Sequence, residues 1–190
     1  MEADWEVEIG GEAPLIHACW DGLVDLRRAP EFAAQLPESR QFPALAQALV
    51  QLNSEASHLW TSKCDVWIPE AFDADELDAQ RREGNCALSC YIDVLPRRQR
   101  NWLSPGDAIA DCRAICSRLR NVPLRCCRAD LIVRQAHIAP GRHGLGITAY
   151  LTACGSTPDS ARETLESALG ALASAILPVP GPATPASKLQ

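Results

Sequence analysis

The sequence lacks any apolar run close to the roughly 18 residues that a membrane-spanning helix needs. Its most apolar stretch, residues 165–177, carries Glu166 and Ser167 near its start and is rich in alanine, which predicts a buried amphipathic helix. The chain begins Met-Glu-Ala-Asp-Trp-Glu, acidic where a secretory signal is basic and then apolar. We therefore expect a soluble, cytoplasmic protein without a membrane partner.

An excess of basic residues is missing as well. The sequence holds 18 Lys and Arg residues against 24 Asp and Glu residues, a formal net charge of −6 at pH 7, with an isoelectric point near 5.2. Such a charge favours solubility and offers no electrostatic footprint for DNA or RNA. We therefore expect no nucleic-acid partner.

Motifs of metal and cofactor chemistry are also missing. No Cys-x-x-Cys pair occurs, no two histidines have the His-x-x-x-His spacing, and neither the G-x-S-x-G elbow nor the H-E-x-x-H helix is present. Asp73, Asp75 and Asp78 resemble the start of a calcium loop, but the glycine and the closing glutamate of that loop are missing. We predict no metal ion and no cofactor, and the sequence identifies no catalytic residue.

Cysteine, by contrast, is abundant, with nine residues. A reducing compartment does not favour a disulfide framework. Cys112 and Cys116 share the apolar side of a predicted helix, which favours packing in the core. Cys126 and Cys127 lie between two arginines, whose guanidinium groups would stabilise a thiolate and lower its pKa. A reactive thiol at Cys126 or Cys127 is therefore one hypothesis, and simple burial of both is the alternative.

The length of 190 residues fits one domain of ordinary size. From Pro178 onward the composition shifts to Pro, Ala, Gly and Ser, which is too poor in large apolar side chains to fold. We predict a single α+β domain over residues 1–177 and a disordered Pro/Ala-rich tail over residues 178–190.

Apolar periodicity and helix-capping residues predict the elements of this domain. The expected strands cover residues 5–9, 59–68, 87–95, 124–137 and 145–154. The expected helices cover residues 43–52 and 104–120 and a segment that begins at the cap 157–159. Residues 30–36 predict one or two helical turns, and residues 13–28 fit a helix or a strand equally well.

The order of these elements predicts the fold class. Strand, helical region, strand, strand, helix, strand, strand, helix matches an α+β, ferredoxin-like split βαβ sheet that is extended by one strand and a C-terminal helix. Right-handed crossovers would place the helices on one face of that sheet. The other face is then solvated, paired with a second subunit, or used to bind something.

Alternation along the strands predicts what this open face displays. From residues 59–68 it takes Thr61, Lys63, Asp65 and Trp67, or else the opposite set. Tyrosines, aspartates and arginines at the centres of strands are typical of sites that hold a polar molecule. The candidate ligand-binding residues are Lys63, Asp65, Tyr91, Asp93, Arg128, Asp130, Arg134 and Tyr150.

The favoured interpretation is a non-catalytic ligand-binding or regulatory domain that works through this polar face as a homodimer, on a small polar or anionic ligand. The first alternative is a small enzyme that uses Asp65, Asp93 or Asp130 as acid or base, with an arginine holding an anionic substrate. The second is a thiol-based sensor or metal-handling protein centred on Cys126 and Cys127. A merely solvated face, with weak surface ion pairs, is the simplest alternative of all.

Overall fold

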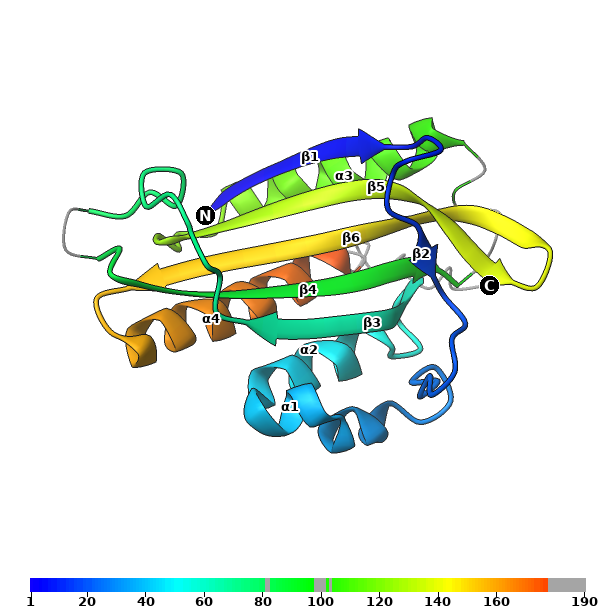
Figure 1. Ribbon diagram of the computed structural model, residues 1–190, viewed down its shortest axis with the longest axis horizontal. Coiled ribbons are helices and arrows are strands. Elements are labelled where there is room, and N and C mark those ends of the chain that lie inside the picture. The colour runs from blue at the N-terminus through cyan, green and yellow to red at the C-terminus, as the bar shows by residue number, and fades with distance from the viewer. Residues whose placement is uncertain (81–82, 98–101, 103, 178–190) are drawn as a thin grey trace, which may run out of the picture.

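One mixed sheet with helices on a single side makes up the fold (Figure 1). The computed structural model describes residues 1–80, 83–97, 102 and 104–177. The strands are β1 (Glu2–Glu8), β2 (Ile16–His17), β3 (Leu59–Trp67), β4 (Cys86–Pro96), β5 (Cys127–Ala139) and β6 (Arg142–Gly155). The helices are the 3-10 helix η1 (Pro30–Gln35), α1 (Pro37–Gln41), α2 (Pro43–Leu52), α3 (Pro105–Arg120) and α4 (Pro158–Ile176).

The strands lie in the order β1-β5-β6-β4-β3, and β2 also pairs with β5. β1 and β2 run parallel to β5, whereas the other neighbours are antiparallel. β4 and β5 therefore run parallel on either side of β6, and α3 connects them. β1 and β3 lie at opposite edges and run antiparallel, so the first half of the chain forms no βαβ unit. The α+β class is confirmed, but the ferredoxin-like arrangement is not.

Local sequence accounts for the helices. α2 has the predicted bounds, with Leu45, Leu49 and Leu52 buried on one side. Ser104 and Asp107 form a capping box at the start of α3, and Thr157 caps α4 through the backbone N–H of Ser160. None of the described helices combines the length and hydropathy needed to cross a membrane. The predicted tail, residues 178–190, lies outside the described residues.

The main core lies between the sheet and helices α2, α3 and α4. Leucines of α4 pack against the side of β6 that carries Ile147, Ala149 and Leu151, all of which are almost fully buried. The same side of β4 contributes Ile92 and Val94. Burial of these apolar side chains is the main force that stabilises the domain, and it leaves the opposite side of the sheet open at its centre.

Two segments cover the ends of this open face. At one end, Ile16 and Ala18 pack on Trp60, Leu95 and Ala136, and Figure 1 shows β2 passing in front of the sheet there. β2 comes so close to β6 that a Cβ atom added at Gly146 would lie 2.7 Å from the Ile16 side chain. Residues 13–28, which the sequence left undecided, thus hold a short strand and turns and no helix.

At the other end, the loop before β4 covers the sheet. Leu77 and Phe72 pack on Ala87 and Cys154, with Cys126 beside them. Gly84 sits where a Cβ atom would lie 2.5 Å from the Cβ atom of Ala74, so the loop turns tightly before β4 begins. The centre of the open face, between these two covers, is the part that remains accessible.

Candidate functional site

Three aromatic side chains occupy the centre of the open face. Tyr91 of β4 and Tyr150 of β6 are directly opposite in the strand register, with ring centroids 6.0 Å apart. Trp67 of β3 lies 6.1 Å from Tyr91 and 6.4 Å from Tyr150, nearly perpendicular to the latter ring. These separations are those of interacting aromatic pairs. We call Trp67, Tyr91 and Tyr150 the aromatic triad.

A hydrogen-bonded network lies next to the triad. Thr148 Oγ1 donates to Asp93 Oδ1 at 2.6 Å. Arg134 Nη1 in turn donates to Thr148 Oγ1 at 3.3 Å and to the Tyr150 hydroxyl at 3.2 Å. Asp93 is only 7% exposed, and this burial raises the pKa of its carboxyl group, although Thr148, Arg134 and Lys63 act in the opposite direction.

Both arginines of the predicted site are held by carboxylates of the protein itself. Arg134 donates through Nη2 and Nε to Glu8 Oε2, at 2.7 and 3.0 Å. Arg128 donates through Nε to Asp130 Oδ1 at 2.8 Å. Neither guanidinium group is therefore available as an unpaired partner for an anion, which was the role expected of them.

A β-bulge in β3 changes which of its side chains reach the open face. The register shifts between Thr61 and Cys64, so two residues, Ser62 and Lys63, lie opposite Asp93. Thr61 faces the helices, where its hydroxyl accepts a hydrogen bond from Asn53, and Asp65 pairs with Tyr91 on the open side. The expected alternation holds for Asp65 and Trp67 but fails at Thr61, because the bulge reverses the direction of the side chains before it.

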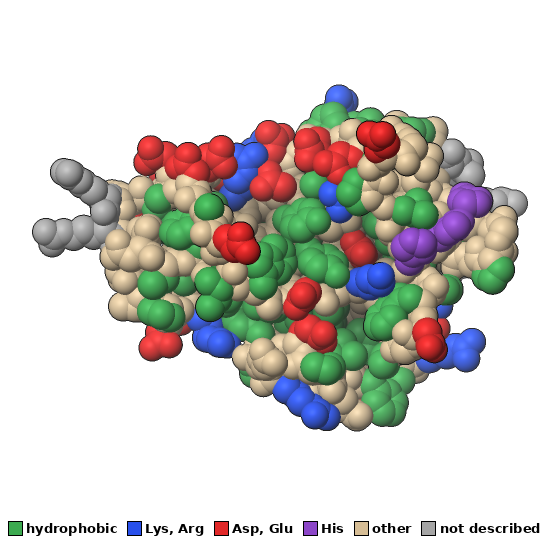
Figure 2. All heavy atoms as spheres, in the orientation of Figure 1, with side chains coloured by type: hydrophobic (Ala, Val, Ile, Leu, Met, Phe, Trp, Pro, Cys, Tyr) green, Lys and Arg blue, Asp and Glu red, His purple; other side chains and the backbone are tan. Residues whose placement is uncertain are grey.

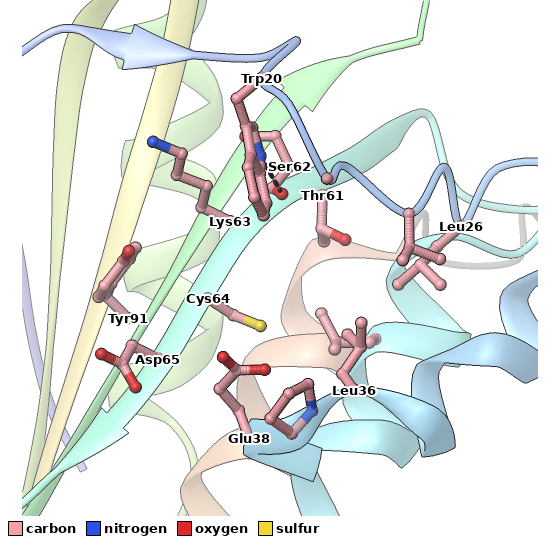
Figure 3. Close-up of a pocket in the computed structure, with 14 residues that line it drawn as sticks. Trp20, Leu26, Leu36, Glu38, Thr61, Ser62, Lys63, Cys64, Asp65 and Tyr91 are labelled. Carbon is pink, nitrogen blue, oxygen red and sulfur yellow. Dashed lines mark hydrogen bonds between the residues drawn. The ribbon is translucent and has the colours of Figure 1, made fainter.

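A cavity of about 530 Å³ opens beside this surface along β3, the outer strand of the sheet (Figure 3). Its apolar wall comes mainly from Val24, Leu26, Leu36 and Leu49. Its polar lining includes Glu38 at the start of α1 and a set from β3 and β4, namely Ser62, Lys63, Cys64, Asp65 and Tyr91. Cavities of this size, mostly apolar with a few polar groups, are typical of small-molecule sites.

The side chains around the cavity approach it from both sides of β3. In Figure 3, Glu38 and Leu36 extend toward Cys64, whereas Tyr91 and Asp65 lie together on the open-face side. Trp20 lies across the strand, and its indole Nε1 donates to the Ser62 carbonyl oxygen at 3.4 Å. The Ser62 hydroxyl is buried and, among the described residues, has no hydrogen-bond partner.

The potential around this cavity is negative. Burial, followed by the charges of Glu38, Asp65 and Asp93, raises the pKa of the Cys64 thiol to about 12. Burial and neighbouring carboxylates raise the pKa of Tyr91, also to about 12. Burial, the larger cause, disfavours any charge, whereas the carboxylates of Glu38 and Asp65 disfavour a negative charge only, so the site is better suited to a cation than to an anion. Lys63, whose Nζ lies 5.6 Å from the ring centre of Trp20, is the one cation in the cavity lining.

Figure 2 shows that acidic side chains are also frequent on the wider face. Acidic side chains line one border of the face, and apolar side chains lie near its middle. The acidic border includes the open-face residues of β1, which pair with alternate residues of β5. These β1 residues are Glu2, Asp4, Glu6 and Glu8.

The structure divides the eight predicted site residues into three groups. Lys63, Asp65 and Tyr91 line the cavity. Asp93, Arg134 and Tyr150 form the adjoining network, and Arg128 and Asp130 make a separate ion pair on β5 beside β1. The sequence reasoning missed Trp20 and Glu38 as members of the site. Alternation within the strands carried no signal for Trp20 or Glu38, which reach the site from outside the strands.

The two candidate thiols lie away from this surface. Cys126, which has a left-handed φ of 60°, packs under the loop before β4, where its Sγ donates to Glu83 Oε2 at 3.5 Å. Burial and Glu83 raise the pKa of Cys126, and burial raises that of Cys127 to about 12. Arg125 does lower the pKa of Cys126, as expected, but burial and Glu83 outweigh it. All nine cysteines are free thiols.

Comparison with known proteins identifies no relative. No family model, no curated protein and no solved structure matches the chain.

Proposed function

We propose that this protein is a non-catalytic ligand-binding domain, and that its ligand is an organic cation with an apolar body, held in the cavity along β3. The observation that carries the proposal is the combination of an apolar wall with two carboxylates, Glu38 and Asp65, in one cavity of about 530 Å³. Enclosed apolar surface supplies affinity, and a few fixed charges supply orientation.

The apolar body would lie against the leucines of the wall. Leu26, Leu36 and Leu49 come from three separate segments, and Leu49 and Leu26 are largely buried even in the free protein. Because the wall is built on α2 and on the packed turn before η1, little ordering is needed when a ligand enters. Such preorganisation favours binding, since less conformational entropy is lost.

The cationic group would lie toward Glu38, Asp65 and the ring of Tyr91. Carboxylates attract a cation directly, and an aromatic face attracts it through the ring quadrupole. In Figure 3 the Lys63 ammonium group extends away from Glu38, so it does not neutralise the cavity at this point.

The other interpretations have less support. An enzyme acting on an anionic substrate would need an unpaired arginine, yet Arg128 and Arg134 are both paired with carboxylates. A thiol-based sensor would need a lowered pKa, and that of Cys126 is raised. The homodimer stays a prediction: a second copy stacked on the open face would bury the aromatic triad, a large apolar anchor of the kind that interfaces favour.

The test compares three probes that share an apolar body and differ in charge: 4-phenylbutylamine, 4-phenylbutanol and 4-phenylbutyrate. Isothermal titration and thermal shift of the full chain should show saturable binding of the amine and weaker binding of the alcohol. Glu38→Gln and Asp65→Asn should each weaken amine binding about two- to fivefold, the effect of one partly screened charge. Glu163→Gln on the exposed side of α4 is the matched control and should change nothing.

Two results would contradict the proposal. Binding of 4-phenylbutyrate as tight as that of 4-phenylbutylamine would show that the negative potential does not select the ligand. Absence of binding by any probe, together with a stable dimer in which the aromatic triad is buried, would assign the face to assembly instead.

A further inference from the structure

Three of the four histidines form a row across three neighbouring strands at the turn end of the β5–β6 hairpin. His17 of β2 is the register partner of His137 of β5, and His137 is the register partner of His143 of β6. Directly paired residues of adjacent strands point to the same side of a sheet and have neighbouring side chains. Chain positions more than 100 residues apart are thus brought together, and Figure 2 shows histidines gathered at one end of the molecule.

The two imidazole rings on the hairpin already contact each other through their Nε2 atoms. His137 Nε2 and His143 Nε2 are 3.2 Å apart, and the ring centroids are 4.1 Å apart. Two imidazole nitrogens bound to one tetrahedral zinc ion, each at about 2.0–2.1 Å, are about 3.3 Å from each other. The pair therefore has the spacing of two ligands of one metal ion, while in the free protein one Nε2–H donates to the other Nε2.

The third ring is close but is not yet turned toward the pair. The centroids of His17 and His137 are 5.7 Å apart, in an edge-to-face arrangement. In the described part of the chain, no three His, Cys, Asp or Glu side chains already converge as a complete metal site. Rotation of the exposed His17 ring about its side-chain bonds is the change that a third ligand requires.

We propose that His137 and His143, with His17 as a third ligand, bind a divalent late first-row transition metal ion such as Zn²⁺. Imidazole nitrogen suits zinc, copper and nickel, and it does not suit calcium or magnesium. His17 and His143 are exposed and His137 is half-buried, so water can fill the remaining coordination position. This site is independent of the cavity along β3 and involves none of its residues.

A bound ion would also connect three strands. β2 pairs with β5 through only two residues, so its attachment to the sheet has little hydrogen-bonding support of its own. A metal ion held by His17 and the hairpin would fix β2 in place, and binding to the folded state alone stabilises that state.

The test titrates zinc chloride into the full, reduced chain at pH 7.5 and follows the imidazole nitrogens by NMR. One equivalent should bind, with shifts at Nε2 of His137 and His143. His137→Gln or His143→Gln should weaken zinc binding at least about tenfold, and His17→Gln should weaken it less. His58→Gln is the matched control, because His58 lies near Asp111 instead, and zinc affinity should be unchanged.

Because the chain carries free thiols, cysteine variants distinguish the alternatives. Cys19→Ser removes the exposed thiol and should leave zinc affinity unchanged. The proposal would be overturned if zinc affinity were unchanged in both His137→Gln and His143→Gln. It would also be overturned if Cys19→Ser, with all histidines intact, abolished zinc binding. A wild-type chain that binds zinc only at millimolar concentration would overturn it as well.

Discussion

Thr148 donates a 2.6 Å hydrogen bond to Asp93 across two adjacent strands, at a point where the carboxyl group is almost completely removed from solvent. Burial has the larger effect and raises the pKa of Asp93. The folded protein therefore holds a proton on this residue more tightly than the unfolded chain does. The stability that Asp93 contributes is present at low pH and is lost as the pH rises through its folded pKa.

The first prediction follows from the raised pKa of Asp93. Asp93→Asn removes the buried charge and keeps an oxygen that accepts from Thr148, so at pH 7 it should increase the free energy of unfolding. The gain should shrink as the pH falls from the raised folded pKa of Asp93 toward about 4, the usual pKa of a free aspartate, and should be absent below it. Urea unfolding between pH 4 and 8 measures both effects.

Asp25→Asn is the opposite control. A hydrogen bond and the charge of Arg27 lower the pKa of Asp25, so its carboxylate stabilises the folded state above the usual aspartate pKa. Asp25→Asn should therefore lose up to about 1 kcal/mol at pH 7, as expected for a surface pair. Equal losses in both variants would show that burial does not determine the behaviour of Asp93.

The second prediction concerns the two arginines, which look equivalent in the sequence. Arg134 is 9% exposed and contacts Glu8, Thr148 and Tyr150, whereas Arg128 has one carboxylate partner and is more exposed. Arg134→Ala should lower the free energy of unfolding by about 2–3 kcal/mol, because charged hydrogen bonds are lost. Arg128→Ala should cost less than about 1 kcal/mol. Chemical denaturation of both variants gives the comparison, and equal costs would contradict it.

The third prediction concerns Asn53, at the end of α2. Its buried amide donates to Leu49 O and Thr61 Oγ1 and accepts from the Thr61 backbone N–H. Asn53→Ala should cost about 1–3 kcal/mol, since it leaves a buried N–H without a partner where the bulge begins. The exposed Asn121, which caps α3, is the control, and its alanine variant should change stability by no more than about 0.5 kcal/mol. A calorimetric melt of each variant is sufficient.

The fourth prediction concerns thiol reactivity at pH 7.5. Cys19 is the exposed cysteine, so Cys19→Ser should remove the fastest phase of reaction with a disulfide reagent, and Cys126→Ser should leave that phase intact. Glu83→Gln should speed up Cys126, because Glu83 raises its pKa. A wild-type Cys126 that reacts faster than a free thiol would restore the thiol-based hypothesis.

Much of the fold could be predicted because it depends on short-range patterns. The period of apolar residues gave α2 its bounds, and the strict alternation of residues 87–95 located the centre of β4. The same alternation placed Tyr91, Asp93 and Tyr150 on one face of the sheet, where the structure has them. Each of these depends on residues within one helical turn or two strand positions, which the sequence displays directly.

The site itself depends on contacts that no local pattern contains. A bulge of one residue in β3 turns Thr61 inward and leaves Lys63 opposite Asp93. Trp20 and Glu38 reach the cavity from a turn and from a short helix, and the partner of Arg134 is Glu8, 126 residues away. The order of the strands in the sheet decides which distant residues come into contact. The order of the elements along the chain is compatible with several such strand orders.

The sequence alone therefore determined a two-sided sheet, with an apolar side for the helices and a polar side rich in tyrosine, aspartate and arginine. Only the tertiary structure decided that β1 joins β5, so that Glu8 neutralises Arg134, and that β2, β5 and β6 align three histidines. The physical reason is the range of the interactions. Side-chain direction follows from backbone geometry over a few residues, whereas charge pairing and ligand geometry depend on which distant strands become neighbours.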